Sequence, residues 1–150
     1  EMRAKLLTTP PSELGFSADK DFPALYGALL EFRIDDITAT VYGLRDGSAS
    51  VYTTGGFGVI GGIGHESVRQ AAGIFVSMAT RFVNRGIQTT TFPYPADGKT
   101  QFYFLTYDGP RLCTIEESAI MTGKDELRDL YAAGQDLLTK LRTTQESVKP

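Results

Sequence analysis

A glycine-rich segment is the clearest place in this sequence for chemistry. Residues 56–61 read Gly-Phe-Gly-Val-Ile-Gly, which matches the G-x-G-x-x-G pattern between a predicted strand and a predicted helix. Such a segment can bind a phosphate, because its backbone N–H groups and the helix N-terminus face the anion. The preceding strand is one arm of a predicted hairpin, however, and the sequence lacks a ribose-binding acid about twenty positions later and the lysine of a P-loop. We therefore interpret the segment first as an apolar loop that covers a partner, and second as a small-molecule or nucleotide-binding loop.

Few residues could act as a nucleophile or a base. The chain has one histidine, His65, and one cysteine, Cys113. Ser67 lies two positions after His65, and helical residues at that spacing do not face each other. Cys113 lies in a predicted strand and is interpreted as a small buried hydrophobe. One His and one Cys cannot form a three-ligand zinc site without carboxylates, so we predict no catalytic residue, no metal site and no cofactor.

The charged residues are spread evenly along the chain. Asp35-Asp36 and Glu116-Glu117 are adjacent acidic pairs, but each lies at the end of a predicted element, where solvated charges are the rule. The net charge is −3 and no dense Lys/Arg cluster occurs, which argues against a nucleic-acid or anionic-membrane surface. No apolar run is long enough for a signal peptide, and we predict a cytoplasmic protein without a membrane span.

The glycine-rich segment also carries large apolar side chains. In water, each would lose about 1.5–3 kcal/mol relative to burial, so something is expected to cover them. Gly58 and Gly61 are expected to use positive φ angles, where a β-branched residue would be strained. The predicted partner or ligand loop consists of Gly56, Phe57, Gly58, Val59, Ile60, Gly61, Ile63 and His65.

Two long helices are predicted from apolar side chains at three- and four-residue spacing. The first runs from His65 to Arg85, with Glu66 in its first turn, where a negative charge complements the helix dipole. The second carries a stripe from Leu127 to Leu141 and follows residues 122–125, which resemble a capping box.

A third helix is predicted over residues 19–34. Its apolar residues follow helical spacing, and Pro23 fits the first turn, where the missing N–H costs little. A strand from Tyr26 to Ile34 is the alternative. The residues that set the spacing are Phe22, Leu25, Tyr26, Leu29 and Phe32.

Five strands are predicted, with Asp-Gly turns between several of them. They cover residues 37–44, 48–54, 87–92, 101–107 and 111–116. Hairpin adjacency then gives a five-stranded antiparallel sheet in the order 2-1-5-4-3, counting these strands along the chain. The fold class is α+β in three α/β/α layers, with the helix at 65–85 on one face and the other two helices on the opposite face.

The chain is long enough for one core and too short for two comfortable domains. We therefore predict a single α+β domain over residues 19–142. Residues 1–18 are expected to form a flexible arm, and residues 143–150 a frayed tail.

This order of elements resembles the roadblock family of dynein light-chain-like domains, within the profilin-like and longin-like architecture. The resemblance rests on a helix before a hairpin with a turn at Arg45-Asp46-Gly47, a long helix ending at Gly86, and a three-stranded return before a last helix. It departs from the family at residues 55–64, where the family pattern implies a short linker. The resemblance implies a homodimer that scaffolds or regulates a partner, such as a small GTPase.

Two predicted surfaces favour a dimer. The strand at 87–92 would be an edge with unpaired backbone groups, and the long helix carries almost no charge between Ala71 and Thr80. A two-fold axis beside this helix would cover both surfaces at once. The predicted interface residues are Gly73, Ile74, Val76, Ser77, Thr80, Ile87, Thr89 and Thr91. The leading hypothesis is thus a non-enzymatic homodimeric interaction module, and the alternative is a small-molecule or nucleotide sensor.

Overall fold

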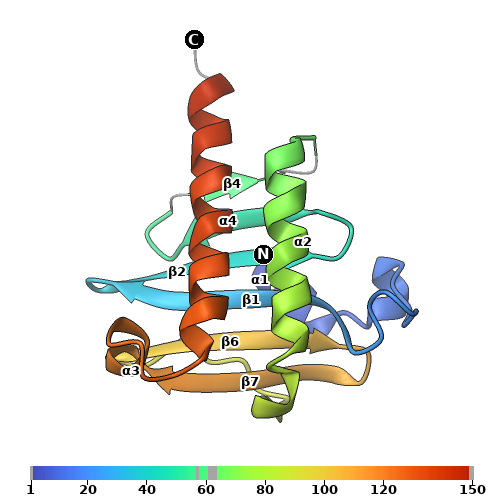
Figure 1. Cartoon of the computed structure of the whole chain (residues 1–150), viewed down its shortest axis with the longest axis horizontal. Coiled ribbons are helices and arrows are strands. Elements are labelled where there is room, and N and C mark those ends of the chain that lie inside the picture. The colour runs from blue at the N-terminus through green and yellow to red at the C-terminus, as the bar shows by residue number, and fades with distance from the viewer. Residues whose placement is uncertain (1, 57, 61–63, 149–150) are drawn as a thin grey trace.

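The computed structural model describes residues 2–56, 58–60 and 64–148. Over these residues the chain forms one antiparallel sheet of seven strands in the order β4-β3-β2-β1-β6-β7-β5 (Figure 1). The strands are β1 (Leu25–Ile34), β2 (Ile37–Leu44), β3 (Ala49–Thr53), β4 (Gly58–Ile60), β5 (Ile87–Gln88), β6 (Lys99–Thr106) and β7 (Gly109–Glu116). The short strands β4 and β5 extend the two edges of a sheet that the other five build.

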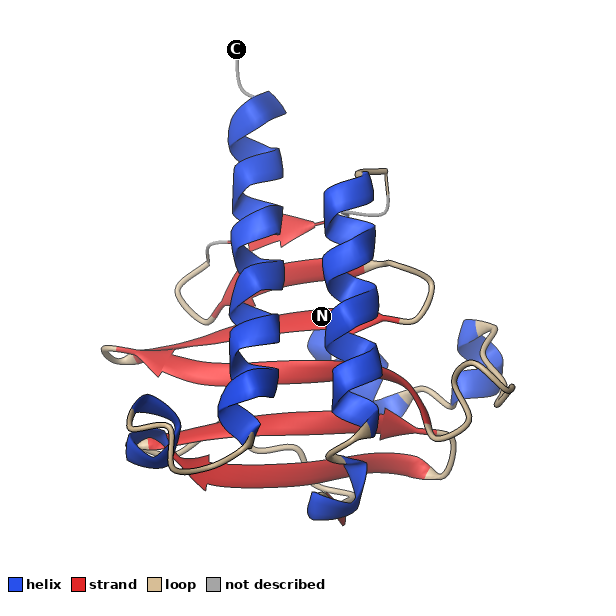
Figure 2. Ribbon diagram, in the orientation of Figure 1, coloured by secondary structure: helices blue, strands red, loops and turns tan. Residues whose placement is uncertain are grey.

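Two long helices lie side by side on one face of this sheet, and a short helix lies on the other (Figure 2). We call these the helix face and the second face. The helices of the helix face are α2 (Glu66–Thr80) and α4 (Leu127–Val148), and that of the second face is α1 (Met2–Thr8). A further short helix, α3 (Glu117–Met121), connects β7 to α4, and 3-10 turns occupy Pro11–Leu14 and Val83–Arg85. The α+β class is confirmed, but the prediction that the two long helices lie on opposite faces is wrong.

The predicted helix over residues 19–34 is also wrong, because most of this segment forms the central strand β1. This strand pairs with β2 on one side and β6 on the other. The predicted order 2-1-5-4-3 therefore fails: β1 lies between the first hairpin and the return strands, and β6 rather than β7 lies next to it. The alternative assignment of a strand from Tyr26 to Ile34 is confirmed.

A β-bulge explains the helical spacing in β1. The register against β6 shifts between Leu25 and Gly27, so that Leu25 and Ala28 both reach the helix face. Tyr26 and Leu29 both reach the second face. A bulge inserts one extra residue, and so converts the two-residue repeat of a strand into three-residue spacings. Those spacings imitate a helix.

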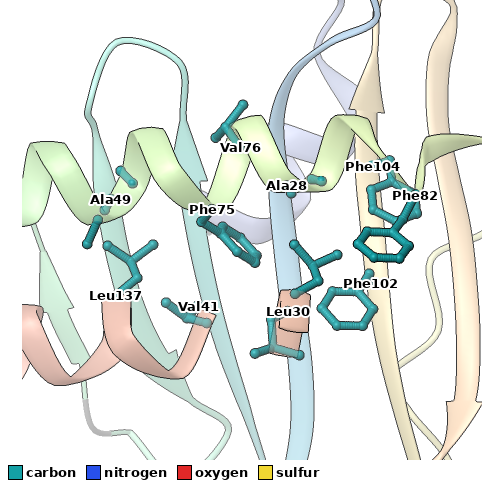
Figure 3. Close-up of a cluster of buried hydrophobic side chains, with 14 of the residues drawn as sticks. Ala28, Leu30, Val41, Ala49, Phe75, Val76, Phe82, Phe102, Phe104 and Leu137 are labelled. Carbon is teal, nitrogen blue, oxygen red and sulfur yellow. The ribbon is translucent and has the colours of Figure 1, made fainter. Parts of the chain in front are cut away.

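The helix face carries a dry apolar core (Figure 3). Leu30 of β1 lies opposite Val41 of β2 and Phe102 of β6, and all three are fully buried. Phe75 of α2 and Leu137 of α4, both fully buried, pack over the sheet from the two helices. Each such side chain contributes about 1.5–3 kcal/mol on burial, so this face supplies much of the stability of the domain.

Close approach of α4 to the sheet depends on Gly134. A Cβ built at this position would lie 2.6 Å from Leu30 Cδ2 and 3.1 Å from Phe75 Cε1. Real Cβ atoms do not approach other atoms so closely, and therefore the absence of a side chain lets α4 pack down against both residues.

The Asp-Gly turns are confirmed. Gly47, Gly98 and Gly109 have φ angles of 91°, 75° and 115° in the turns after β2, before β6 and between β6 and β7. Glycine adopts such angles without steric cost, which is why the Asp-Gly signal is reliable here.

The ends of the chain differ from expectation. The predicted flexible arm contains α1, which buries Leu6 and Leu7 on the second face. The last helix extends to Val148 and so includes most of residues 143–150, which were predicted to form a frayed tail. The predicted strand at 87–92 is limited to Ile87–Gln88, followed by a single backbone bond from Thr89 N–H to the Pro110 carbonyl.

Candidate interaction surface and buried polar network

Half of the predicted dimer residues lie on the outer side of α2, namely Gly73, Ile74, Ser77 and Thr80. Ile74 is 56% exposed, and Ser77 is exposed beside it. A Cβ built at Gly73 would have no neighbour within 4 Å, so the helix surface is open at this point. Thr80 is half-buried and donates its hydroxyl to the Val76 carbonyl at 3.2 Å.

Val76 does not belong to this outer surface. Its side chain is fully buried in the core of the helix face, which Figure 3 shows beside Phe75. The prediction that Val76 lies on the outer side of α2, in a dimer interface, is therefore corrected. Burial of Val76 follows from its position next to Phe75 and one turn after Ala72, both of which are also buried.

The predicted residues after α2 lie on a separate part of the molecule. Ile87 of β5 is 77% exposed at the edge of the sheet, beyond β7. Thr89 and Thr91 bond to each other, with the Thr89 hydroxyl donating to the Thr91 carbonyl at 2.7 Å. α2 itself packs against β1, β2 and β3, so the helix surface and the β5 edge do not form one continuous patch.

Within the glycine-rich segment, residues 58–60 form the short strand β4. Gly58 lies in β4 opposite Tyr52 of β3, and its φ angle is not positive, contrary to expectation. Gly56 does adopt a positive φ of 99° in the preceding turn. Val59 and Ile60 complete β4, with Val59 opposite Val51 and Ile60 opposite Ser50. The calls on Phe57, Gly61 and Ile63 lie outside the described residues.

The candidate nucleophiles and bases are not brought together. His65 is exposed at the N-cap of α2 and makes no side-chain capping bond. Cys113 is buried, and burial raises the pKa of its thiol above the ordinary value. Glu116 forms an ion pair with Lys99 across the β6–β7 pair. Among the residues that the structure describes, no cluster of three His, Cys, Asp or Glu side chains could hold a metal ion.

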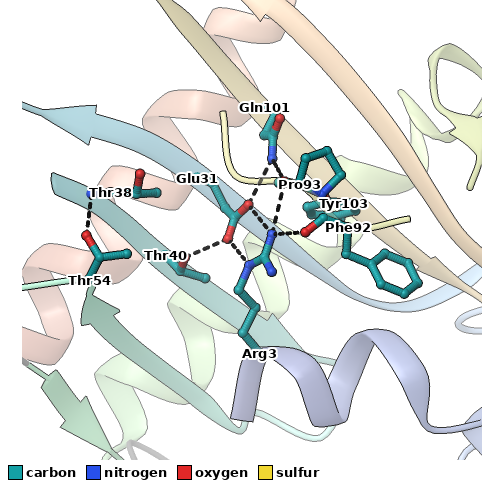
Figure 4. A network of polar contacts seen from close by, with 9 residues as sticks. All are labelled: Arg3, Glu31, Thr38, Thr40, Thr54, Phe92, Pro93, Gln101 and Tyr103. Atoms are coloured by element: carbon teal, nitrogen blue, oxygen red, sulfur yellow. Dashed lines mark hydrogen bonds and ion pairs between the residues drawn. The ribbon is translucent and has the colours of Figure 1, made fainter. Parts of the chain in front are cut away.

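A buried ion pair on the second face is the most organised polar feature of the described structure (Figure 4). Arg3 of α1 donates two hydrogen bonds to Glu31 of β1, with Nε–Oε2 2.5 Å and Nη2–Oε1 3.1 Å. Glu31 is fully buried and Arg3 is 6% exposed. Thr40 of β2 and Gln101 of β6, which lie opposite Glu31 in the sheet, donate to the same carboxylate at 2.7 and 2.9 Å. The Glu31 carboxylate thus receives bonds from three sides.

The same network binds the segment between β5 and β6. Arg3 Nη2 also donates to the Phe92 and Pro93 carbonyls, at 3.0 and 3.1 Å. Gln101 and the Tyr103 hydroxyl donate to the Pro93 carbonyl at 2.8 and 2.6 Å. The Glu31 carboxylate, which accepts four hydrogen bonds, has little capacity left for a substrate. The network therefore acts as a clamp that joins α1, the sheet and residues 92–93.

The electrostatics of the clamp agree with this role. Burial alone would lower the pKa of Arg3, but its hydrogen bond and charge interaction with Glu31 outweigh burial and raise it. Burial, together with the nearby negative charge of Glu31, raises the pKa of Tyr103 to about 12. The Arg3 guanidinium also lies 4.1 Å from the centroid of the Tyr94 ring, a cation–π distance. The Arg3 guanidinium therefore keeps its charge inside the clamp.

Comparisons of the chain with protein-family models, with curated proteins and with solved structures found no match. None of the helices in the described part of the chain has both the length and the apolar character needed to cross a bilayer.

Proposed function

We propose that this protein is a non-enzymatic interaction module that acts as a homodimer, with two copies packing through the outer surface of α2. The observation that carries the proposal is Ile74, a large apolar side chain that is 56% exposed halfway along a helix of the domain core. Its neighbours Gly73 and Ser77 are small, so a second helix could approach the α2 backbone closely.

The magnitudes favour a weak, concentration-dependent dimer. Burying two copies of Ile74 would contribute about 1.5–3 kcal/mol each. Association costs roughly 4–15 kcal/mol in lost translational and rotational freedom, so Ile74 alone is insufficient. The interface must therefore extend to the polar neighbours on α2, such as Gln70 and Arg81, and reach roughly 1,200 Å² in total.

Two buried groups support a non-enzymatic role, because each has a structural explanation. Glu31 is saturated by hydrogen bonds, and the pKa of the buried Cys113 thiol is raised. The strand order differs from the one predicted from hairpin adjacency. The proposal depends on the α2 surface and not on the resemblance to the roadblock family. A small GTPase remains the partner class that the resemblance suggests. The alternative, a nucleotide sensor, gains no support from Gly58, which lies in a strand.

Sedimentation velocity over a range of protein concentrations tests the proposal. The wild type should change from monomer to dimer as concentration rises, and Ile74→Glu should remain monomeric. Ile87→Glu is the matched control, because it places the same charge on an isoleucine that is even more exposed but lies at the β5 edge. A wild type that is monomeric throughout, or a dimer that only Ile87→Glu disrupts, would contradict the proposal.

A further inference from the structure

A cavity of about 290 Å³ lies between the end of α1 and the turn that joins β6 to β7. Its walls are apolar and aromatic, and include Leu6, Pro10, Pro11, Tyr26, Tyr107 and Pro110. Ligand pockets of proteins start at roughly 300 Å³, so this volume fits a ligand with one ring.

The Tyr26 hydroxyl makes the cavity more than a surface irregularity. Tyr26 is 2% exposed and its hydroxyl forms no hydrogen bond with any described residue, but this oxygen is not among the side-chain atoms that are sealed from solvent. Tyr107 differs, since its hydroxyl donates to the Phe22 carbonyl at 2.8 Å and accepts from Arg45 at 3.0 Å. A tyrosine hydroxyl both donates and accepts hydrogen bonds, so the Tyr26 hydroxyl is available to a ligand.

The aromatic rings around Tyr26 hold it in place. Phe16 stacks on it with ring centroids 5.2 Å apart, and Tyr107 packs against it at 5.6 Å with an interplanar angle of 45°. Burial, followed by the neighbouring Tyr107, raises the pKa of Tyr26 to about 12, so the hydroxyl keeps its proton and can donate. A fixed aromatic ring with a free donor is a preformed recognition element.

We propose that this cavity binds an uncharged ligand with a single aromatic ring, whose polar substituent bonds to the Tyr26 hydroxyl. The proline and tyrosine walls favour an aromatic ring, because aromatic pairs gain energy beyond the area that they bury. The lining has one acidic side chain, Asp108, and no basic one, which disfavours an anionic ligand. This site is independent of the dimer surface on α2.

Two probes of the same shape test the hydrogen bond: p-cresol, which carries a hydroxyl, and toluene, which does not. Titrations of the full chain, followed by amide chemical shifts in NMR, should give saturable shifts at Leu7, Tyr26 and Gly109. One hydrogen bond of ordinary strength corresponds to about fivefold tighter binding of p-cresol than of toluene. Tyr26→Phe should remove this preference while leaving the binding of toluene unchanged.

Two further variants separate a binding role from a structural one. Tyr42→Phe removes a hydroxyl from another buried tyrosine of the second face and should leave the preference for p-cresol intact. Thr9→Phe adds bulk to the cavity wall and should weaken both probes. Tyr26→Phe should also melt close to the wild type, since the hydroxyl that it removes bonds to no described residue. No saturable shift, equal affinity for both probes in the wild type, or an unchanged preference in Tyr26→Phe would overturn the proposal.

Discussion

Neighbouring residues on the same three strands meet two different environments. On the helix face, Leu30 lies between Val41 and Phe102, and the contacts are wholly apolar. The adjacent row of paired residues points to the second face. There Glu31 lies between Thr40 and Gln101 and binds Arg3. Successive residues of a strand point to opposite faces, so these two rows are back to back in the sheet.

The difference between the faces shows what each contributes. The apolar row is covered by two helices of 15 and 22 residues, which bury it by area. The polar row is covered by a seven-residue helix, which is too short to be stable alone. A buried ion pair contributes little net stability against apolar replacements, but it does fix one arrangement of the groups that it joins. We infer that the helix face stabilises the domain and the clamp positions α1.

The largest expected effect is on the helix face. Phe75→Ala should lower the free energy of unfolding by about 3–5 kcal/mol, and Leu130→Ala or Leu137→Ala by about 2–5 kcal/mol each, because all three are fully buried in a well-packed core. Chemical denaturation at neutral pH measures these losses. Losses below about 1 kcal/mol at all three positions would mean that the two helices do not hold the sheet.

The second prediction addresses the clamp. Glu31→Leu leaves the Arg3 guanidinium buried without its partner and should cost about 3–5 kcal/mol. The double variant Arg3→Met with Glu31→Leu removes both charges and should cost clearly less than Glu31→Leu alone. Equal losses in the single and double variants would show that α1 is held by its leucines and not by the ion pair.

The two faces also explain which parts of the fold the sequence could predict. The turns at Gly47, Gly98 and Gly109 depend on local backbone chemistry, and they were predicted correctly. β1 was misassigned because a strand buried on both faces, with a bulge at residues 25–27, has no simple two-residue repeat.

The clamp could not be predicted from spacing at all. Arg3 and Glu31 are 28 residues apart, and a single Glu in an apolar run is ordinarily read as the end of an element. Thr40 and Gln101 contact Glu31 only because of the strand register. That register depends on the order of strands in the sheet, which was predicted incorrectly. The position of Ile74 and Ser77 on the outer side of α2 follows directly from helical periodicity.

The third prediction tests how tightly the helix face is packed. Gly134→Ala introduces a Cβ that would lie 2.6 Å from Leu30 Cδ2. Overpacking of this kind costs about 1–3 kcal/mol, and the better helix propensity of alanine offsets up to about 1 kcal/mol of that. We expect a net loss in thermal stability. A gain would mean that α4 lies further from β1 than the structure shows.

The fourth prediction concerns how α4 begins. Asp125 accepts the Leu127 N–H at 2.9 Å and pairs with Arg85 at 2.6 Å. Asp125→Ala removes the cap and the ion pair and should cost about 1 kcal/mol, whereas Asp125→Asn keeps a good cap and should cost less.

The same carboxylate gives a pH dependence. The hydrogen bond from Arg85 is the main cause that lowers the pKa of Asp125 below its ordinary value. Its contribution is therefore complete above the unfolded pKa of about 3.9 and disappears as the pH falls through the lower folded value. The difference in melting temperature between the wild type and Asp125→Asn should be constant from pH 7 to 5 and close at lower pH. A difference that persists in strong acid would exclude the ion pair as its source.

The smallest expected effect is at Gly73, which is the counterpart of Gly134 on the other helix. A Cβ at Gly73 would meet nothing within 4 Å, so Gly73→Ala adds helix propensity without a clash. In a dilute, monomeric sample it should raise the free energy of unfolding by about 0.5–1 kcal/mol, which is about 1–4 °C in Tm for a chain of this size.

Measuring Gly73→Ala at several protein concentrations tests whether a second copy covers the outer surface of α2. If two copies pack through α2, the added methyl group lies between helices that Gly73 would otherwise allow to approach closely. The gain from Gly73→Ala should then shrink or reverse at concentrations where the wild type is dimeric, while Gly134→Ala should lose the same amount at every concentration. A gain at Gly73 that is independent of concentration would show that no second helix covers this part of α2, and a loss even in dilute solution would show that the surface is not open.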